Sequence, residues 1–434
     1  MNDNKNIKFA GLQMLTGGAY FGTENAVGHP AEFMISYPGF DAPKFNKEGK
    51  LVDAGNEYFL LEYLKKHDRS VPYYQFDRTP FQDDYNMEPT ILRDGKPVEH
   101  PNYENIDLVV AVPVCAGLSG ASTASVERKN ACNNNMLYLA SYALNVIKPK
   151  VYVFENAPRL MGDAGSVVRE KLEQIAKDAN YSVAYYKTNT YWHDNCQDRP
   201  RTFVYFFRAD GDRKGAPNLG FEHKHVTVSE FLSRIPSNST ENHTMPKSEL
   251  CTSMYDYFKH LHGEEWRSKV KTRSLISELV KTKQLDAWNE FVQKSDSISD
   301  KAKSQVDRLV KHIYDKAKDG KGFYETTFTL TSDDKVPAAM FKTIPFALHH
   351  SEDRLYTIRE WMSFMGMPYD FEMPGDVCLT FRKIGQNVPA RTMQFIASEA
   401  INVIKNWDTV ERAPNLNVMF FDNIKEKSSV MKDL

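Results

Sequence analysis

The chain has 434 residues, of which 41% are hydrophobic and 26% charged, and its formal net charge is -2. This composition is typical of a soluble globular protein with two or three cores, and it gives no overall basic signature for nucleic acid, so DNA binding would need a local basic face. No apolar run approaches the roughly 18 residues needed to cross a bilayer, so we expect no membrane contact.

The cysteines and the first residues of the sequence indicate in which cellular compartment the protein is expected. The five cysteines are scattered and form no CxxC pair; they are Cys115, Cys132, Cys196, Cys251 and Cys378. This pattern predicts neither a disulfide framework nor a structural zinc site, and we expect no bound metal. The opening MNDNKNIKFAG lacks the pattern of a secretion signal, so we expect a cytoplasmic protein, in a bacterial or phage-infected cell.

Strands and helices alternate over the first 210 residues. Apolar and β-branched runs predict strands over 7–15, 32–36, 73–76, 106–112, 150–154, 182–187 and 202–207, and helical periodicity predicts helices over 57–66, 133–147 and 165–179. Such an order predicts an α/β domain with a doubly wound, mostly parallel sheet.

The character of the sequence changes near Pro217. A polar connector is followed by a charged stretch of helical period, Leu250 to Lys318, whose Lys and Arg clusters fit either solvated helix faces or a local basic face. After Thr343 the sequence again has the pattern of a compact domain, and the last element that it predicts is a helix over 389–405. We therefore expect a catalytic domain built from 1–215 and 341–434, with a smaller, largely helical domain, 216–340, inserted between them.

Polar residues follow several of the predicted strands. Cys115 lies in the loop AVPVCAGLS, at the carboxyl end of a strand, which is where ligands bind in open α/β sheets. Glu155 and Asn156 end the next strand, and Gln197, Arg199 and Arg201 precede another. Each has a purely structural alternative: a cysteine packed as a small hydrophobe, a glutamate capping a turn, and an exposed pair of arginines.

Five stretches in this order resemble the DNA (cytosine-5) methyltransferase family: AVPVCAGLS, KPKVYVFENAPRL, NCQDRPRTFVYFF, RLYTIREWMSFMGMPYDFEMPG and RKIGQNVPARTMQFIASEAI. Pro113, Cys115, Gly117 and Ser119 fall on the Pro, Cys, Gly and Ser of the family's GGPPCQGFS loop. The resemblance covers about 7–210 and 344–405, and it implies a Rossmann-like methyltransferase fold with a target-recognition domain between them.

The resemblance also implies roles on the base. The Cys115 thiolate would add to C6 of a flipped cytosine, so that C5 can attack a one-carbon donor. Glu155, if protonated, would donate to ring N3; Arg199 would approach O2, and Arg201 would brace the loop or a phosphate. Ser119, Asn156 and Gln197 are the expected further contacts to the substrate.

The residues that the resemblance implies for binding the one-carbon donor depart from the family pattern. In the gapless register GLQMLTGGAYFGTE, the agreeing residues include Gly17, Gly18 and Glu24, but Gln13 and Leu15 replace the family's Phe and first Gly. A register starting at Phe9-Ala10-Gly11 would restore the family's FAG but requires an insertion. Ser36 stands where a ribose-binding carboxylate is expected, Asp77 suits the acid beside the adenine, and Pro113 and Gln386 complete the expected donor contacts.

Three hypotheses follow. The first is a monomeric enzyme that methylates cytosine C5 in DNA with S-adenosylmethionine. The second keeps the base chemistry but uses another one-carbon donor, for example hydroxymethylation from methylene-tetrahydrofolate. The third is a non-catalytic DNA-binding protein on the same scaffold.

Overall fold

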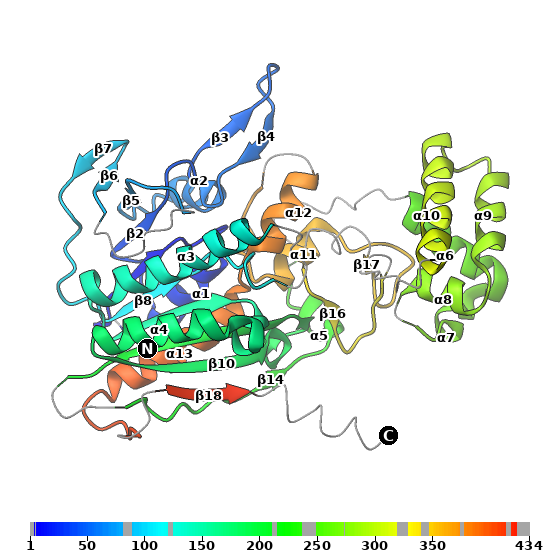
Figure 1. Ribbon diagram of the computed structural model, residues 1–434. Coiled ribbons are helices and arrows are strands. Elements are labelled where there is room, and N and C mark those ends of the chain that lie inside the picture. Colours follow the sequence, from blue (N-terminus) through cyan, green and yellow to red (C-terminus); the bar gives the residue numbers. More distant parts are fainter. Residues whose placement is uncertain are drawn as a thin grey trace.

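The structure is a computed structural model that describes residues 4, 6–80, 89–119, 125–210, 215–236, 249–272, 274–318, 329–339, 347–373, 377–413 and 418–422. Figure 1 shows a large α/β part beside a smaller helical part. In the described residues, no helix is long and apolar enough to span a bilayer.

A ten-stranded sheet forms the centre of the α/β part. Its five central strands run parallel, and an antiparallel strand, β13, separates β9 from β10. In spatial order the strands are β18 (Val418–Asp422), β10 (Tyr181–Asn189), β13 (Pro200–Arg208), β9 (Val151–Asn156), β8 (Leu108–Ala111), β1 (Phe9–Leu12), β2 (Phe33–Ser36), β5 (Tyr73–Phe76), β6 (Ile91–Arg93) and β7 (Lys96–Val98).

Helices cover both faces of this sheet, as expected of a doubly wound fold. Successive strand residues point to opposite faces, so Val110 and Val153 join one apolar core while Val109 and Phe154 join the other. The first face is covered by α1 (Gly18–Val27), α2 (Tyr58–Lys66), α11 (Ile358–Phe364), α12 (Val377–Gln386) and α13 (Ala390–Lys405). The second is covered by α3 (Val126–Tyr142), the π-helical turn Ala143–Ile147 and α4 (Ser166–Asp178).

Topology determines where ligands can bind. From β1 the chain moves to β2 on one side, and it returns to β8 on the other side. A crevice therefore opens at the carboxyl ends of β1 and β8, where open α/β sheets bind their ligands. The loops after β2 and β9 reach the same edge of the sheet.

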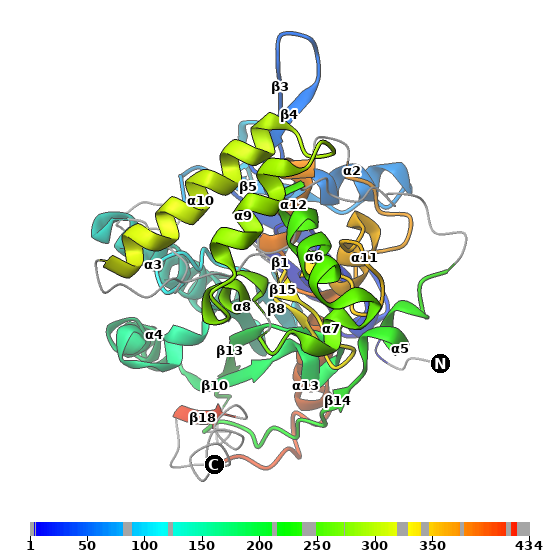
Figure 2. The same ribbon diagram turned by 90° about the vertical axis from the view of Figure 1, so that its right-hand side faces the viewer.

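The smaller part is a helical unit with its own apolar core (Figure 2). It comprises α6 (Glu249–His262), α7 (Trp266–Lys269), α8 (Leu275–Lys281), α9 (Leu285–Lys294) and α10 (Asp300–Lys318). Helix α10 buries Ala302, Val306, Val310 and Ile313, which share one face because they recur at helical spacing, while its other faces are polar.

Short elements connect the two parts. They are β11 (His193–Asn195), β12 (Gln197–Asp198), β14 (Lys224–His225), α5 (Val228–Leu232), β15 (Thr329–Leu330), β16 (Val336–Pro337) and β17 (Ala347–Leu348). Phe231 and Val336 pack in the core of the α/β part, whereas Leu348 packs in that of the helical unit. The domain boundaries at 216 and 340 stay a prediction, because residues on each side of them share cores.

Several elements differ from the expectation. The first strand ends at Leu12 rather than Leu15, because Gln13 and Leu15 take left-handed backbone conformations, each with φ of 53°. Helix α3 begins earlier than predicted, where the Ser125 side chain accepts a hydrogen bond from the Arg128 amide. Helix α1 and a hairpin, β3 (Pro43–Phe45) and β4 (Leu51–Ala54), were not predicted at all.

Candidate active site

The loop after β8 presents the Cys115 thiol. Asn135 of α3 holds the loop by accepting a hydrogen bond from the Val114 amide at 2.8 Å. A Cβ at Gly117 would lie 2.2 Å from Asn133 Oδ1, so glycine is required for this close approach of α3. Cys115 is exposed, whereas the other cysteines whose side chains are described are buried. The rest of this loop lies partly outside the described residues, which stop at Ser119 and resume at Ser125.

Glu155 and Arg201 form a buried ion pair beside this thiol. Glu155 ends β9 with 4% exposure, and its Oε1 lies 2.6 Å from Arg201 Nε. Although part of the Cys115 residue is exposed, the surrounding protein atoms desolvate its sulfur and raise the pKa of the thiol; the Glu155 charge raises it further, while Arg201 and Arg199 lower it. The sheet therefore brings a thiol, a carboxylate and two guanidinium groups within electrostatic range of one another.

Arg199 is held by carbonyl oxygens rather than by a carboxylate. It is 2% exposed; Nη1 donates to Ala339 O at 2.7 Å, Nη2 donates to Asn387 O at 2.8 Å, and Gly385 O is 3.3 Å from both. Burial, followed by the Arg201 charge, lowers the pKa of Arg199 to about 9. Arg199 thus ties the start of β13 to the segment after α12.

Gln197 is fully buried and its amide is used inside the protein. Its Oε1 accepts from the Ala339 amide at 2.9 Å, and its Nε2 donates to Met365 Sδ at 3.3 Å and to Phe364 O at 3.4 Å. The expectation of a substrate contact is not supported by these contacts, which make Gln197 a brace between segments.

Asn156 is the last residue of β9, and Ser119 lies in the loop after β8. Asn156 is fully buried, and its Oδ1 accepts a hydrogen bond from the Ala157 amide at 2.8 Å. Its Nδ2 has no hydrogen-bond partner among the described residues. Ser119 is half-buried, at the end of the Cys115 loop.

The turn at the start of α1 is packed against the segment after α12. Gly17 has φ of 108°, a conformation that favours glycine, and a Cβ at Gly18 would lie 1.9 Å from Val388 O. The Gly18 amide donates to Asn387 Oδ1 at 2.9 Å. Sequence comparison pointed to Gln386 for this segment, but Gln386 is exposed and its buried neighbour Asn387 makes the contact.

Glu57 is a functional candidate that sequence reasoning missed. It precedes α2 with 1% exposure, and its carboxylate accepts from the Met14 amide at 2.5 Å and from the Tyr73 hydroxyl at 2.7 Å. Burial raises the pKa of Glu57 to about 7, against the lowering effects of Tyr73, Ser36 and the Met14 amide. A buried carboxylate therefore lies beside the buried Ser36 at the end of β2, and it belongs to the residue that precedes α2.

Two other expected donor contacts lie apart from this group. Glu24 of α1 forms an ion pair with Arg69, and the Tyr20 hydroxyl donates a hydrogen bond to it at 3.3 Å, so its carboxylate is already used within the protein. Asp77 follows β5 and is exposed, with its amide donating to Thr90 O. Pro113 follows β8, and its side chain is buried.

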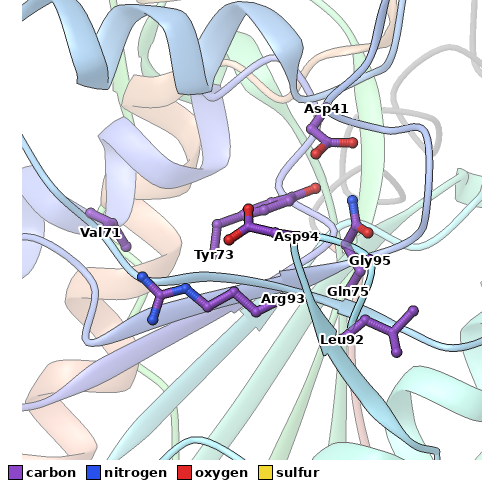
Figure 3. Close-up of a pocket in the computed structure, with 8 residues that line it drawn as sticks. All are labelled: Asp41, Val71, Tyr73, Gln75, Leu92, Arg93, Asp94 and Gly95. Atoms are coloured by element: carbon purple, nitrogen blue, oxygen red, sulfur yellow. The ribbon is translucent and has the colours of Figure 1, made fainter. Parts of the chain in front are cut away.

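A polar cavity of about 350 Å³ adjoins the Glu57–Tyr73 pair (Figure 3). It is lined by Asp41, Val71, Tyr73, Gln75, Leu92, Arg93, Asp94 and Gly95. Strands β1 and β2 separate β5 from β8, so this cavity lies about 14 Å along the sheet from the strand that carries Cys115. It is separate from the thiol site. In the described residues, no three His, Cys, Asp or Glu side chains form a metal-binding group.

Comparison with known proteins places the chain in a family. The profile described as C-5 cytosine-specific DNA methylase matches residues 79–402. The chain therefore belongs to the C-5 cytosine-specific DNA methylase family, and it is a transferase of the DNA methyltransferase type.

Individual relatives are distant. The chain is 21% identical to the Type II methyltransferase M1.HphI of Haemophilus parahaemolyticus over 318 residues, which cover 73% of this chain and 74% of that protein. Among solved structures, it is similar to Entamoeba histolytica EhMeth, with 11% identity, a TM-score of 0.47 and coverage of 93% and 99% of the two chains. It is also similar to Schizosaccharomyces pombe Dnmt2, with 11% identity, a TM-score of 0.42 and coverage of 93% of this chain and 99% of that chain.

Proposed function

We propose that this protein methylates C5 of a cytosine flipped out of DNA, with Cys115 as the nucleophile. The observation that carries the proposal is the meeting of Cys115, Glu155 and Arg201 at one edge of the sheet. Each comes from a different segment of the chain, and each suits one part of a pyrimidine ring.

The Cys115 thiolate adds to C6, and the electron pair displaced from the C5–C6 double bond makes C5 nucleophilic. C5 would then attack the methyl carbon of the donor, whose S–CH3 bond breaks so that the donor leaves as a neutral thioether. Loss of the C5 proton to water, with cleavage of the C6–S bond, restores the aromatic base and the Cys115 thiolate. Glu155 faces N3 and the exocyclic amine, where it stabilises the charge that develops as sulfur adds. Asn156, whose Nδ2 is unpartnered, is a further group for the base.

We assign the base O2 to Arg201 rather than to Arg199. The Nη groups of Arg199 already donate to three carbonyl oxygens, and breaking these bonds would leave buried acceptors unpaired. Arg201 instead contacts Glu155 and its own neighbour Pro200 O, and it is more exposed. Arg199 then acts as a positioning residue for the segment that contains Asn387.

S-adenosylmethionine is the donor that we propose for the crevice between β1, β2 and β8; it supplies a methyl group activated on sulfur. The group of residues fits, because a buried carboxylate, Glu57, lies at the carboxyl end of β2, and Gly17 and Gly18 form the turn before α1. Gln13 Oε1 is buried there without a partner among the described residues. Gln13 and Glu57 would thus orient the donor's polar groups.

Mass spectrometry of nucleosides, from DNA isolated after expression of the protein, tests the proposal. We expect deoxycytidine carrying one added methyl group, and no modified nucleoside with Cys115→Ala. Cys132→Ala is the matched control, because Cys132 is buried in α3 and should leave modification intact. A hydroxymethyl product would instead indicate a folate donor, and modification by the Cys115→Ala variant would overturn the mechanism.

A further inference from the structure

A two-stranded hairpin, β3 and β4, extends from the α/β part. Figures 1 and 2 show it rising beyond the neighbouring helices in both views. It follows β2, so its base lies at the same edge of the sheet as the loops that carry Cys115 and Glu155. The mechanism above does not use this hairpin.

The tip of the hairpin has a defined conformation. Asn46 Oδ1 accepts hydrogen bonds from the Glu48 amide at 3.0 Å and the Lys50 amide at 2.9 Å. Gly49, with φ of 77°, donates to Asn46 O at 3.0 Å. A partner that binds this tip would pay little conformational entropy, because the turn is already ordered.

The hairpin is also fixed to the active-site region. Asp53 of β4 lies 3.5 Å from Arg382 of α12, and Lys383 of the same helix donates to Asn56 Oδ1 at 3.0 Å. Gly385 lies near the end of α12 and Asn387 follows this helix, and the carbonyl oxygens of both accept hydrogen bonds from Arg199. The hairpin therefore has a fixed position relative to the base-binding residues.

Its surface combines exposed apolar groups with positive charge. Phe45 is 56% exposed and Val52 is 42% exposed. Lys44, Lys47 and Lys50 are exposed around the tip. The acids of the hairpin are Glu48 at the tip and Asp53, whose Oδ2 lies 3.9 Å from Lys44 Nζ, so the hairpin keeps a net positive charge. An exposed ring on a short strand pair promotes unwanted association unless a partner covers it.

We propose that the β3–β4 hairpin contacts duplex DNA beside the flipped base, with Lys44, Lys47 and Lys50 on phosphates and Phe45 against the groove wall. The inference rests on the proposed function, because it takes DNA as the substrate. Charge complementarity and continuity with the base-binding edge support DNA over a protein partner. Such contacts add affinity without reading sequence.

The test compares two triple variants of the full-length protein. Lys44→Ala/Lys47→Ala/Lys50→Ala removes the hairpin charges, while Lys171→Ala/Lys177→Ala/Lys405→Ala removes equal charge from α4 and the end of α13. Binding of a fluorescent mixed-sequence duplex is measured over a range of salt concentrations. We expect the hairpin variant to bind about tenfold more weakly and its log–log salt slope to fall by about 0.9 per lost phosphate contact. Phe45→Ala should weaken binding without changing the slope.

The outcomes separate the two proposals. If the hairpin variant binds like the control variant, the hairpin inference is wrong, whereas nucleoside modification by the wild type would leave the proposed function standing. If the wild type binds duplex through the hairpin but modifies no cytosine, the hairpin contact stands and the proposed chemistry fails. A wild type that binds no duplex DNA overturns both.

Discussion

Arg199 and Arg201 illustrate how two identical residues acquire different roles. They are two positions apart at the start of one strand, yet one donates to main-chain carbonyls and the other pairs with Glu155. The sequence predicted that both belong to the site, because both precede a strand that reaches the ligand-binding edge. It assigned O2 of the base to Arg199, because nothing near Arg199 in the sequence shows that carbonyl oxygens of Ala339, Gly385 and Asn387 accept from its guanidinium group.

Glu57 was missed for a related reason. Its sequence context, GNEYF, reads as the start of a helix, and nothing near it signals a partner. Its contact with the Met14 amide crosses 43 residues and depends on how the loop after β1 folds. A buried carboxylate with distant partners leaves no local pattern in a sequence.

Glu57→Gln should change how stability depends on pH. Burial raises the pKa of Glu57 to about 7, so between about pH 4.5 and about pH 7 the folded state holds a proton that the unfolded state has lost. Wild-type stability therefore falls through this window as pH rises, and the loss is complete above about pH 7. We expect the variant to gain about 3 kcal/mol relative to wild type between about pH 5 and about pH 8, measured by urea unfolding.

Glu62→Gln is the control for this measurement. Glu62 lies on α2, five residues after Glu57, and is exposed, so Glu62→Gln should leave the free energy of unfolding close to that of wild type. Parallel profiles for wild type and Glu57→Gln would show that Glu57 does not titrate in this range.

At the scale of elements, the sequence predicted the strands in the middle of the sheet, but it did not predict helix α1. The strands of the central sheet are runs of apolar residues buried on both faces, which gives them a strong signal. Helix α1 has no such signal: its residues from Gly18 to Thr23 are all buried between the sheet and α13, so no polar face alternates with an apolar one. The β3–β4 hairpin was missed because most of its residues are exposed.

Gly18→Ala should destabilise the contact between α1 and the segment after α12. The new Cβ would lie 1.9 Å from Val388 O, and a backbone oxygen cannot move without shifting the start of α13. We expect a loss of about 3 kcal/mol or more in the free energy of unfolding, with weakened donor binding. Gly220→Ala is the control, because nothing lies within 4 Å of its Cβ position. Equal thermal midpoints for the two variants would contradict the role given to Gly18.

At the scale of the molecule, the α/β part and the helical unit have separate apolar cores, so a substitution in one core should lower the unfolding temperature of that part first. Trp288 is fully buried in the helical unit, while Leu172 is fully buried on α4 of the α/β part. The sequence indicated a helical insert from its charge and period. It could not locate the shared boundary, because Leu348 joins the helical core from the far side of the insert.

Trp288→Ala should unfold the helical unit before the α/β part. Removing the ring costs about 3–5 kcal/mol, and the cost falls on one core. We expect calorimetry to show an added transition at lower temperature, together with lost DNA modification and retained donor binding. Leu172→Ala should instead lower the transition of the α/β part. A single transition that shifts equally in both variants would show that the cores unfold together.

The hydrogen bond from the Gly18 amide to Asn387 Oδ1 joins residues 369 positions apart in the chain. A ribosome releases Gly18 long before it makes Asn387, so the growing polypeptide carries an incomplete crevice through most of its synthesis. Premature termination before residue 387 leaves a product without this contact, so the turn at the start of α1 is completed only once the closing segment has been made.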